Sequence, residues 1–280
     1  MNKKQQYTTS NIKHGHATRL HGHVLKKQYG QHFLRDQSVI DAMLEAVTLQ
    51  SQSSIIEIGC GDGVLTKQLQ TLPHERLWVF EIDKEWSDFV TLTYPHPSMT
   101  VFLEDFLQVD FSRFDAHAPW HLLANLPYQI TFPLLHKIQQ NRHLFAESVI
   151  LVQEEVAQKL VATSGRAYNF QSFFFQWFFE LKLLRKVLPS SFVPPPKIDS
   201  RLLYFKPRTT VVEMPMQEEF WKFIKACFVT PRRTIRNNIA TYNFAIQSLP
   251  DDILSLRAQQ VSLEQFIGIW NTYYKQLLSL

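Results

Sequence analysis

The chain has 280 residues, of which 45% are hydrophobic, and a formal net charge of +4, which allows one large domain plus a small one. No run of 18 or more apolar residues occurs, and the polar, basic N-terminus lacks an apolar signal core, so the sequence favours neither a membrane span nor secretion. Two cysteines, Cys60 and Cys227, are too few for a disulfide framework and fit a reducing, cytoplasmic location.

Positive charge is concentrated in two segments. The first 35 residues hold seven Lys or Arg and no Asp or Glu, and residues 201–240 hold eight against three Glu, so the two segments carry +12 and the rest −8. Such segments favour a polyanionic partner such as nucleic acid, because neutralising phosphates releases counterions. Basic tails and helix faces that are merely solvated are the alternative.

The first half of the chain predicts alternating strands and helices. Residues 1–25 lack periodicity and are expected to form a disordered basic tail, whose histidines have no Cys or carboxylate beside them to complete a metal site. Apolar residues at helical spacing predict a helix over 36–49. Strands are expected at 54–58, 77–82, 100–103, 121–124 and 148–152. Helix-length segments between them, such as 64–72 and 84–91, predict an α/β fold with a parallel sheet covered on both faces.

The second half predicts an antiparallel sheet edge and a helical tail. The aromatic run 170–179 is expected to be a core helix and not a base-stacking platform. Strands over 182–187 and 201–205 flank a Pro-rich loop and are expected to pair antiparallel at the sheet edge. A linker near 207–215 divides a catalytic domain, 26–207, from a small helical domain, 216–280.

A glycine-rich turn follows the first strand of the parallel series. Gly59, Gly61 and Gly63 would let a ligand approach the backbone closely. The G-x-G-x-x-G dinucleotide fingerprint would need Gly at position 64, where Val64 stands. The observed spacing, with Glu81 at the next strand's end to accept two ribose hydroxyls, suits a nucleoside cofactor without a pyrophosphate. A turn without a ligand is the alternative.

Two further strand ends carry polar residues. Asp105 closes the third strand, where its carboxylate can accept a hydrogen bond from the cofactor's adenine amine or cap a helix. The tetrapeptide Asn125-Leu126-Pro127-Tyr128 follows the fourth strand. The Asn oxygen and a backbone carbonyl can accept hydrogen bonds from an exocyclic amine while the Tyr ring stacks on the base, as methylation of an adenine amine requires. Asn-x-Pro-x is also ordinary turn chemistry, but its place in an ordered series of four strand ends favours the site.

The series resembles the ribosomal RNA adenine N6-dimethyltransferase family, S-adenosylmethionine-dependent enzymes. The resemblance covers about residues 26–270 and includes Lys-Lys-Gln-Tyr-Gly-Gln-His-Phe-Leu from Lys26, the stretch 57–63 and Phe-Val-Pro-Pro-Pro-Lys-Ile-Asp-Ser from Phe192. It ends with an arginine signature within 231–238, where the chain reads Arg-Arg-Thr-Ile-Arg-Asn from Arg232. It implies a Rossmann-like methyltransferase sheet with antiparallel edge strands, followed by a small C-terminal helical domain.

The resemblance also implies roles for individual residues. Cofactor contacts are expected from Gln31, His32, Leu34, Gly59, Gly61, Glu81, Asp105 and Asn125. The catalytic set is Asn125, Leu126, Pro127, Tyr128 and Phe192, with Tyr128 and Phe192 bracketing the target adenine. RNA contacts are expected from Lys26, Lys27, Arg232, Arg233 and Arg236. Arg232 and Arg236 would share a helix face, unless one arginine instead ties the two domains together through a carboxylate. No metal is expected.

The implied activity is methyl transfer from S-adenosylmethionine to the N6 amine of adenines in small-subunit ribosomal RNA, two adjacent adenines being dimethylated during ribosome biogenesis. The enzyme is expected to be a monomer. Alternatives are the erythromycin-resistance enzymes of large-subunit RNA, a DNA adenine methyltransferase, and a non-catalytic assembly factor on the same fold. The erythromycin-resistance group typically reads Asn-Ile-Pro-Tyr and lacks the arginine signature. The chain departs from the family pattern at His32, Cys60 and residues 167–172.

Overall fold

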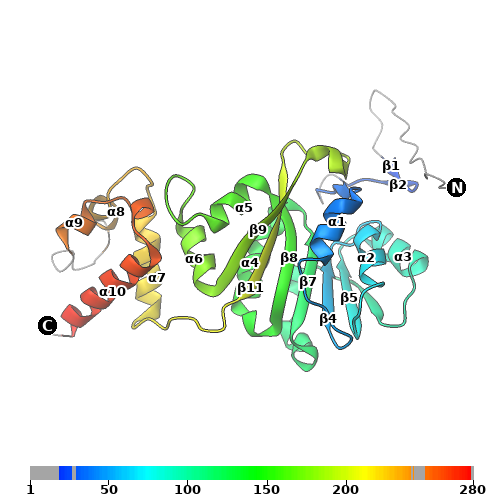
Figure 1. The fold of residues 1–280 in the computed structure, drawn as a ribbon, viewed down its shortest axis with the longest axis horizontal. Coiled ribbons are helices and arrows are strands. Elements are labelled where there is room, and N and C mark those ends of the chain that lie inside the picture. The colour runs from blue at the N-terminus through cyan, green and yellow to red at the C-terminus, as the bar shows by residue number, and fades with distance from the viewer. Residues whose placement is uncertain (1–18, 27–29, 241, 243–249, 279–280) are drawn as a thin grey trace.

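A seven-stranded sheet forms the centre of the molecule (Figure 1) in the computed structural model, which describes residues 19–26, 30–240, 242 and 250–278. Its strand order is β6-β5-β4-β7-β8-β11-β9. The strands are β4 Ser54–Ile58, β5 Arg76–Glu81, β6 Met99–Leu103, β7 Trp120–Asn125, β8 Phe145–Gln153, β9 Phe179–Val187 and β11 Ser200–Pro207. The first five pair in parallel, and β11 pairs antiparallel with both β8 and β9. The expected parallel sheet with antiparallel strands at one edge is confirmed.

Helices cover both faces of this sheet. They are α1 Gln37–Leu44, α2 Val64–Leu69, α3 Lys84–Thr93, α4 Thr131–Gln140, α5 Glu154–Val161 and α6 Phe170–Phe178. In β4, Ile55 packs into the core cluster that holds α1 and α2, whereas Ile56 and Ile58 pack into the cluster that holds α4, α5 and α6. Because both faces are buried, the central strands read as continuous apolar runs without polar alternation.

Part of the segment expected to form a disordered tail is ordered, since β1 (Arg19–Leu20) and β2 (His23–Val24) pair antiparallel. Residues 1–18 of the expected tail lie outside the described residues. The ring of His21 stacks on Phe89 of α3 with centroids 5.1 Å apart. These contacts come from residues far along the chain, which local periodicity does not reveal. A second short antiparallel pair joins β3 (Phe33–Leu34) to β10 (Phe192–Val193). The stretch before α1 therefore reaches the Pro-rich loop.

A helical part follows β11, at the left of Figure 1. Its helices are α7 Gln217–Cys227, α8 Ile235–Ile239, α9 Asp251–Leu254 and α10 Leu263–Leu277. The aromatic run forms α6 and is buried at Phe173, Phe175 and Trp177, which confirms the prediction of a core helix. Trp221 of α7 contacts the rings of Phe173, Phe174, Trp177 and Phe178. One aromatic cluster therefore joins the sheet to the helical part, and the division at 207–215 remains a prediction.

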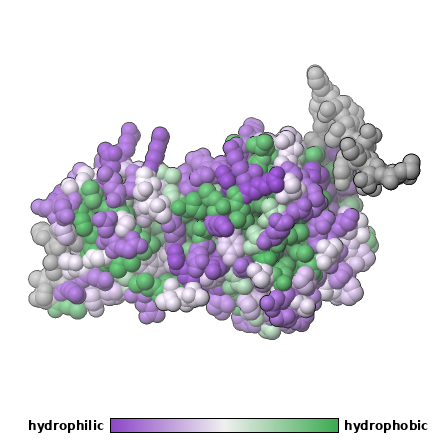
Figure 2. Space-filling model, viewed as in Figure 1, coloured by the Kyte–Doolittle hydropathy of each residue, from purple (hydrophilic) through white to green (hydrophobic). Residues whose placement is uncertain are grey.

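The surface mixes hydrophilic and hydrophobic residues over both parts on the face seen in Figure 2. Among the described helices, none combines the length and the apolar character needed to cross a bilayer.

Candidate active site

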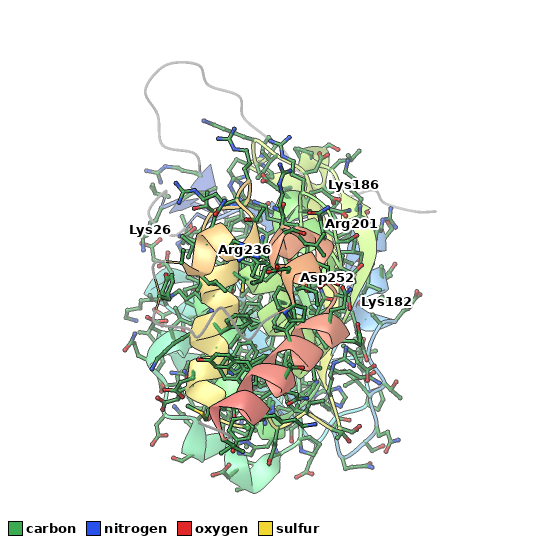
Figure 3. All side chains as sticks on the ribbon, turned by 90° about the vertical axis from the view of Figure 1, so that its left-hand side faces the viewer. Lys26, Lys182, Lys186, Arg201, Arg236 and Asp252 are labelled. Atoms are coloured by element: carbon green, nitrogen blue, oxygen red, sulfur yellow. The ribbon has the colours of Figure 1, made fainter. Side chains whose placement is uncertain are left out.

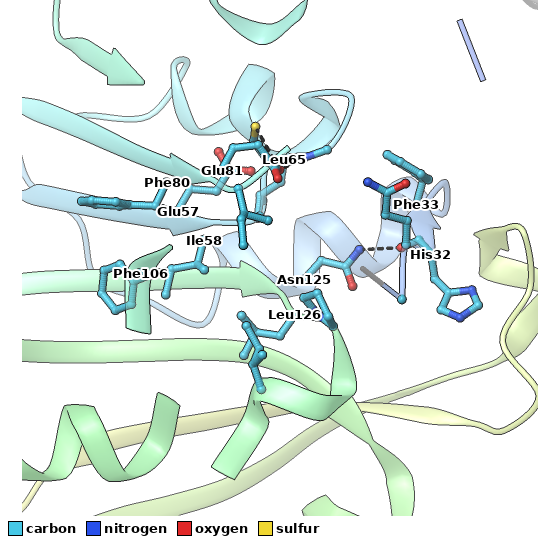
Figure 4. Close-up of a pocket in the computed structure, with 18 of the residues that line it drawn as sticks. His32, Phe33, Glu57, Ile58, Leu65, Phe80, Glu81, Phe106, Asn125 and Leu126 are labelled. Carbon is cyan, nitrogen blue, oxygen red and sulfur yellow. Dashed lines mark hydrogen bonds between the residues drawn. The ribbon is translucent and has the colours of Figure 1, made fainter. Parts of the chain in front are cut away.

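A cavity of about 270 Å³ lies at the carboxyl ends of β4, β5 and β7 (Figure 4). Open α/β sheets bind ligands at this edge, and pockets of a few hundred Å³ hold small molecules. The predicted residues that line it are Gln31, His32, Leu34, Gly59, Gly61, Glu81, Asp105, Asn125, Leu126, Pro127 and Tyr128. Residues up to 97 positions apart in the sequence thus meet at one cavity, as the order of strand ends predicts.

The glycine-rich loop needs its glycines for conformation and for space. Gly59, Gly61 and Gly63 have φ values of +72°, +51° and +76°, the left-handed region in which a side chain is strained. A Cβ on Gly61 would lie 2.7 Å from the ring of Phe33. A Cβ on Gly59 would meet no atom closer than the Asn125 carbonyl oxygen at 4.0 Å. The loop therefore leaves open space beside the tetrapeptide, where a bound nucleoside can approach the backbone.

Glu81 is held rigidly at the end of β5. Its Oε1 accepts a hydrogen bond from the backbone N–H of Asp83 at 2.9 Å, and Oε2 accepts one from that of Gly61 at 3.1 Å. Burial raises the pKa of Glu81, although these two backbone donors oppose the shift. Oε2 also accepts a weak hydrogen bond from Cys60 Sγ at 3.7 Å, and Oε1 keeps capacity for a further bond. The geometry suits a carboxylate that accepts two adjacent ribose hydroxyls.

A second buried carboxyl lies beneath the glycine-rich loop. Glu57 is 1% exposed, and its Oε2 has no hydrogen-bond partner among the described residues. Burial raises the pKa of Glu57 to about 8, and the nearby charge of Glu81 adds to the rise. Glu57 is therefore mostly neutral at pH 7.

Asp105 fulfils the capping alternative and still lines the cavity. Its Oδ1 accepts a hydrogen bond from the backbone N–H of Leu107 at 2.9 Å at the start of a 3₁₀ turn, Phe106–Gln108. The carboxylate has further acceptor sites that this cap does not use. Ile82, which is 50% exposed, and Leu107 line the same part of the cavity, so an adenine ring would find apolar walls beside a hydrogen-bond acceptor.

Asn125 has an orientation that its hydrogen bond fixes. Its Nδ2 donates to the backbone carbonyl of His32 at 2.9 Å (Figure 4). Because a carbonyl only accepts, the amide nitrogen must face His32, and Oδ1 is left as the acceptor. An amide oxygen presented at the cavity can accept a hydrogen bond from an amine. The contact also ties the stretch that contains His32 to the tetrapeptide.

Tyr128 and Phe192 occupy different environments. Tyr128 lines the cavity, and its ring lies nearly parallel to that of His32, with 6.2 Å between centroids and 23° between planes. Phe192 is 2% exposed, packs in the core and is absent from the cavity lining. The expected bracket of two rings around a base is therefore not formed in this structure. For Phe192 to stack on a base, its ring would have to turn out of the core.

Asp83 organises the stretch that precedes β3. This carboxylate is 1% exposed and accepts hydrogen bonds from Lys26 Nζ at 2.6 Å and Gln31 Nε2 at 3.1 Å. The pKa of Lys26 is raised, chiefly because of its hydrogen bond to Asp83. Lys26, which was expected to bind RNA and is labelled in Figure 3, is therefore engaged in an ion pair with Asp83. Lys27 lies outside the described residues.

The arginine signature adopts a turn followed by a short helix. Thr234 caps α8, so Arg232 and Arg233 precede the helix and do not share a face with Arg236 as expected. Arg236, which is labelled in Figure 3, pairs with Asp251 of α9, a contact within the helical part and not to the sheet. Arg232 and Arg233 are exposed and form no ion pair with any other described residue. They are the members of the set that are available to phosphates.

Cysteine and metal chemistry receive no support from the described residues. Cys60 and Cys227 are buried and free. Burial raises the pKa of each thiol, so both stay protonated and unreactive at neutral pH. No cluster of three or more metal-binding side chains occurs in the described ranges.

Three residues of the site were missed by sequence reasoning. Asp83 was visible as a helix cap, since its side chain accepts from Glu85 N–H, but its role in holding Lys26 and Gln31 was not. Ile82 directly follows Glu81 at a strand end, a position that could have indicated a cavity wall. Ser200, which bonds Tyr128, lies 72 residues away, and no local signal connects the two.

The arrangement of sheet and cavity defines a Rossmann-like methyltransferase fold, and solved structures agree. The chain superposes on a dimethyladenosine transferase from Plasmodium falciparum with a TM-score of 0.75, covering 88% of this chain and 98% of that one at 23% identity. A 23S rRNA methyltransferase, ErmE, gives a TM-score of 0.71 over 86% and 99% at 20% identity. At these identities the likeness concerns the fold.

The sequence comparisons identify the family. The family model described as ribosomal RNA adenine dimethylase matches residues 22–273, and the chain belongs to this family. A ribosomal RNA small subunit methyltransferase A from Syntrophotalea carbinolica is 35% identical over 87% of this chain and 95% of its own length. The protein of the same name from Chlorobium phaeobacteroides is 32% identical over 91% of this chain and 95% of its own length. The resemblance expected from the motifs is confirmed.

Proposed function

We propose that the chain transfers methyl groups from S-adenosylmethionine to the N6 amine of adenines in small-subunit ribosomal RNA, two adjacent adenines being dimethylated during ribosome biogenesis. The observation that carries the proposal is the oriented amide of Asn125 at the edge of a cavity that Glu81 and the glycine-rich loop also line. Membership of the adenine dimethylase family supports the reaction class, and the names of the relatives support the small-subunit substrate.

The cavity fits S-adenosylmethionine. The space at Gly59, the two-oxygen acceptor at Glu81 and the apolar walls near Asp105 match a methionine part, a ribose and an adenine in turn. Gln31, His32, Leu34 and Gly61 complete the proposed binding set. When bound, the cofactor supplies a methyl group made electrophilic by its sulfonium.

Asn125 and Leu126 act on the target amine. The amine nitrogen of adenine is a poor nucleophile because its lone pair is delocalised into the ring. Hydrogen bonds from its protons to Asn125 Oδ1 and the Leu126 carbonyl favour a more tetrahedral nitrogen, which frees the lone pair. Tyr128 stacks on the base, a contact worth ~1–3 kcal/mol, and Pro127 keeps the turn rigid. Phe192 would join the base only after leaving the core.

Positioning supplies much of the acceleration, and no dedicated general base is required, because the methylated ammonium is acidic. The target base must lie in a loop or be flipped out of a duplex to reach Asn125. We assign RNA contacts to Arg232 and Arg233, which are exposed. We propose that the enzyme acts as a monomer.

Labelled methyl transfer tests the proposal. The purified protein is incubated with radiolabelled S-adenosylmethionine and, separately, with small subunits, large subunits and duplex DNA from cells in which the gene is deleted. We expect label in small-subunit RNA alone. Label in the large subunit would support the erythromycin-resistance activity, label in DNA a DNA methyltransferase, and none in any substrate an assembly factor; each result would contradict the proposal.

A further inference from the structure

The hydroxyl of Tyr128 has a partner that the proposed reaction does not use. Tyr128 Oη and Ser200 Oγ are 2.6 Å apart. Ser200 is fully buried at the first position of β11. Its backbone is paired on both sides, with Gln153 of β8 and Val187 of β9. The serine hydroxyl is thus attached to a backbone position that is paired with a strand on each side.

The backbone around Tyr128 is much less constrained. Tyr128 begins a three-residue 3₁₀ turn, Tyr128–Ile130. The N-cap residue of this turn is Pro127, whose side chain makes no capping hydrogen bond. Such short turns have poorer hydrogen-bond geometry than an α-helix. The tyrosine ring is held at its face by the His32 ring and at its tip by Ser200. His32 is in turn fixed through Nδ1, which lies 2.8 Å from the Pro194 carbonyl oxygen.

We propose that Ser200 is a positioning residue that sets the plane of the Tyr128 ring, and through it the place of the target adenine relative to Asn125. The inference rests on the proposed function, because it requires that the base stacks on Tyr128. A base stacked on a tilted ring carries its amine away from Asn125 Oδ1. A displacement of about 1 Å can lower a reaction rate by about 100-fold.

The alternative is that the hydrogen bond only ties the turn to the sheet. The two roles differ in what the bond changes. A structural tie contributes to unfolding free energy, whereas a positioning contact contributes to methyl transfer at saturating cofactor and RNA. Tyr204 provides a matched control on the same strand, since its hydroxyl donates to Glu147 Oε1 at 2.8 Å away from the lining of the cavity.

A double-mutant cycle tests the proposal with the full-length chain. Ser200→Ala, Tyr128→Phe and the double variant are compared in single-turnover methylation of small subunits from the deletion strain, at saturating S-adenosylmethionine. We expect each single variant to be slowed between about 10- and 100-fold, and the double variant to be no slower than the slower single one. Melting temperature, cofactor affinity by calorimetry and RNA affinity should stay near those of the wild type. Tyr204→Phe, which removes a structural tie, should keep the wild-type rate of methylation even if its melting temperature falls.

The outcomes separate this inference from the proposed function. A wild-type rate in Ser200→Ala overturns the positioning role. So does a double variant whose fold reduction in rate equals the product of the two single reductions. Tyr128→Ala is measured alongside, and a wild-type rate there would overturn base stacking itself, and with it the inference. A slow Tyr128→Ala with a fast Ser200→Ala would overturn the inference alone. If Ser200→Ala melts early, Tyr128→Phe still tests the bond from its other end, because it leaves β11 unaltered.

Discussion

The hydrogen bonds of single side chains decide what each residue in the cavity can do. Asn125 could have presented either end of its amide, and the His32 carbonyl selects the orientation with Oδ1 available. Glu81 and Glu57 lie close enough for the charge of Glu81 to raise the pKa of Glu57, and burial raises the pKa of both. Backbone donors from Asp83 and Gly61 oppose the rise at Glu81, the carboxyl that we assign to the ribose hydroxyls.

Glu81→Ala should weaken cofactor binding. The variant leaves two hydroxyls without a charged acceptor, a loss of ~1.5–3 kcal/mol. Calorimetric titration with S-adenosylmethionine measures the effect, with the exposed Glu75→Ala as the control. Since burial raises the pKa of Glu81, affinity should also fall as pH is lowered through that pKa. An unchanged affinity in a folded Glu81→Ala variant would remove Glu81 from this role.

Glu57→Gln should change how stability depends on pH. The folded-state pKa of about 8 lies above the ordinary value of 4.5, so the folded protein keeps a proton that the unfolded chain releases. Stability therefore falls as pH rises between these values, by up to about 1.4 kcal/mol per pH unit. Urea unfolding can be measured at roughly pH 5.5 and pH 7.5, in the lower and upper parts of this window. The free energy of unfolding should fall less between the two pH values in Glu57→Gln than in the wild type. An equal fall in both proteins would mean that Glu57 ionises freely when folded.

At the scale of elements, the strands of the sheet were predictable because their signal is local. Five apolar runs between helix-length segments place β4 to β8 correctly, with β8 extending three residues earlier than expected. The glycine-rich loop, Glu81, Asp105 and the tetrapeptide followed from the strand ends, whereas Gln31, His32 and Leu34 were implied only by the family resemblance. What the sequence did not reveal depends on distant partners. The pairing of Lys26 with Asp83 spans 57 residues, and the burial of Phe192 depends on its pairing with β3.

The turn before α8 carries the prediction about RNA. Arg232→Ala with Arg233→Ala removes two exposed cations, and each lost phosphate contact should flatten the slope of log affinity against log salt by roughly 0.7–0.9. The control, Lys67→Ala with Lys84→Ala, removes equal charge from α2 and α3. Fluorescence titrations across a salt series compare the two. The same slope in both double variants would show that Arg232 and Arg233 contribute only net charge.

At the scale of the whole molecule, an aromatic cluster connects catalysis to the helical part. Trp221 of α7 packs on the rings of α6, and Phe266 and Trp270 of α10 belong to the same core. The sequence predicted a core helix for the aromatic run, but its partners lie beyond the expected linker, so the extent of the cluster could not be read locally. The cluster predicts that the two parts unfold together.

Trp221→Ala tests this connection. Truncating a packed tryptophan costs about 3–5 kcal/mol, and the partly buried Trp221 should lie near the lower value. Calorimetry should show a single transition that moves to lower temperature, whereas Leu92→Ala, at a side chain 81% exposed, should leave it in place. Two separate transitions in the wild-type protein, with only one of them shifted in the variant, would mean that the parts fold independently.

We expect methyl transfer to adenine N6 in small-subunit ribosomal RNA to depend on Asn125. Mass spectrometry of that RNA, from a deletion strain complemented with the wild-type chain or with Asn125→Ala, tests it most directly. We expect N6-dimethyladenosine at two adjacent positions with the wild-type chain. With Asn125→Ala, methyl transfer should be slower by ~10²-fold or more, as for loss of one transition-state acceptor, and the modification strongly reduced at equal protein level. Full dimethylation by Asn125→Ala, or none by the wild-type chain, would contradict the account.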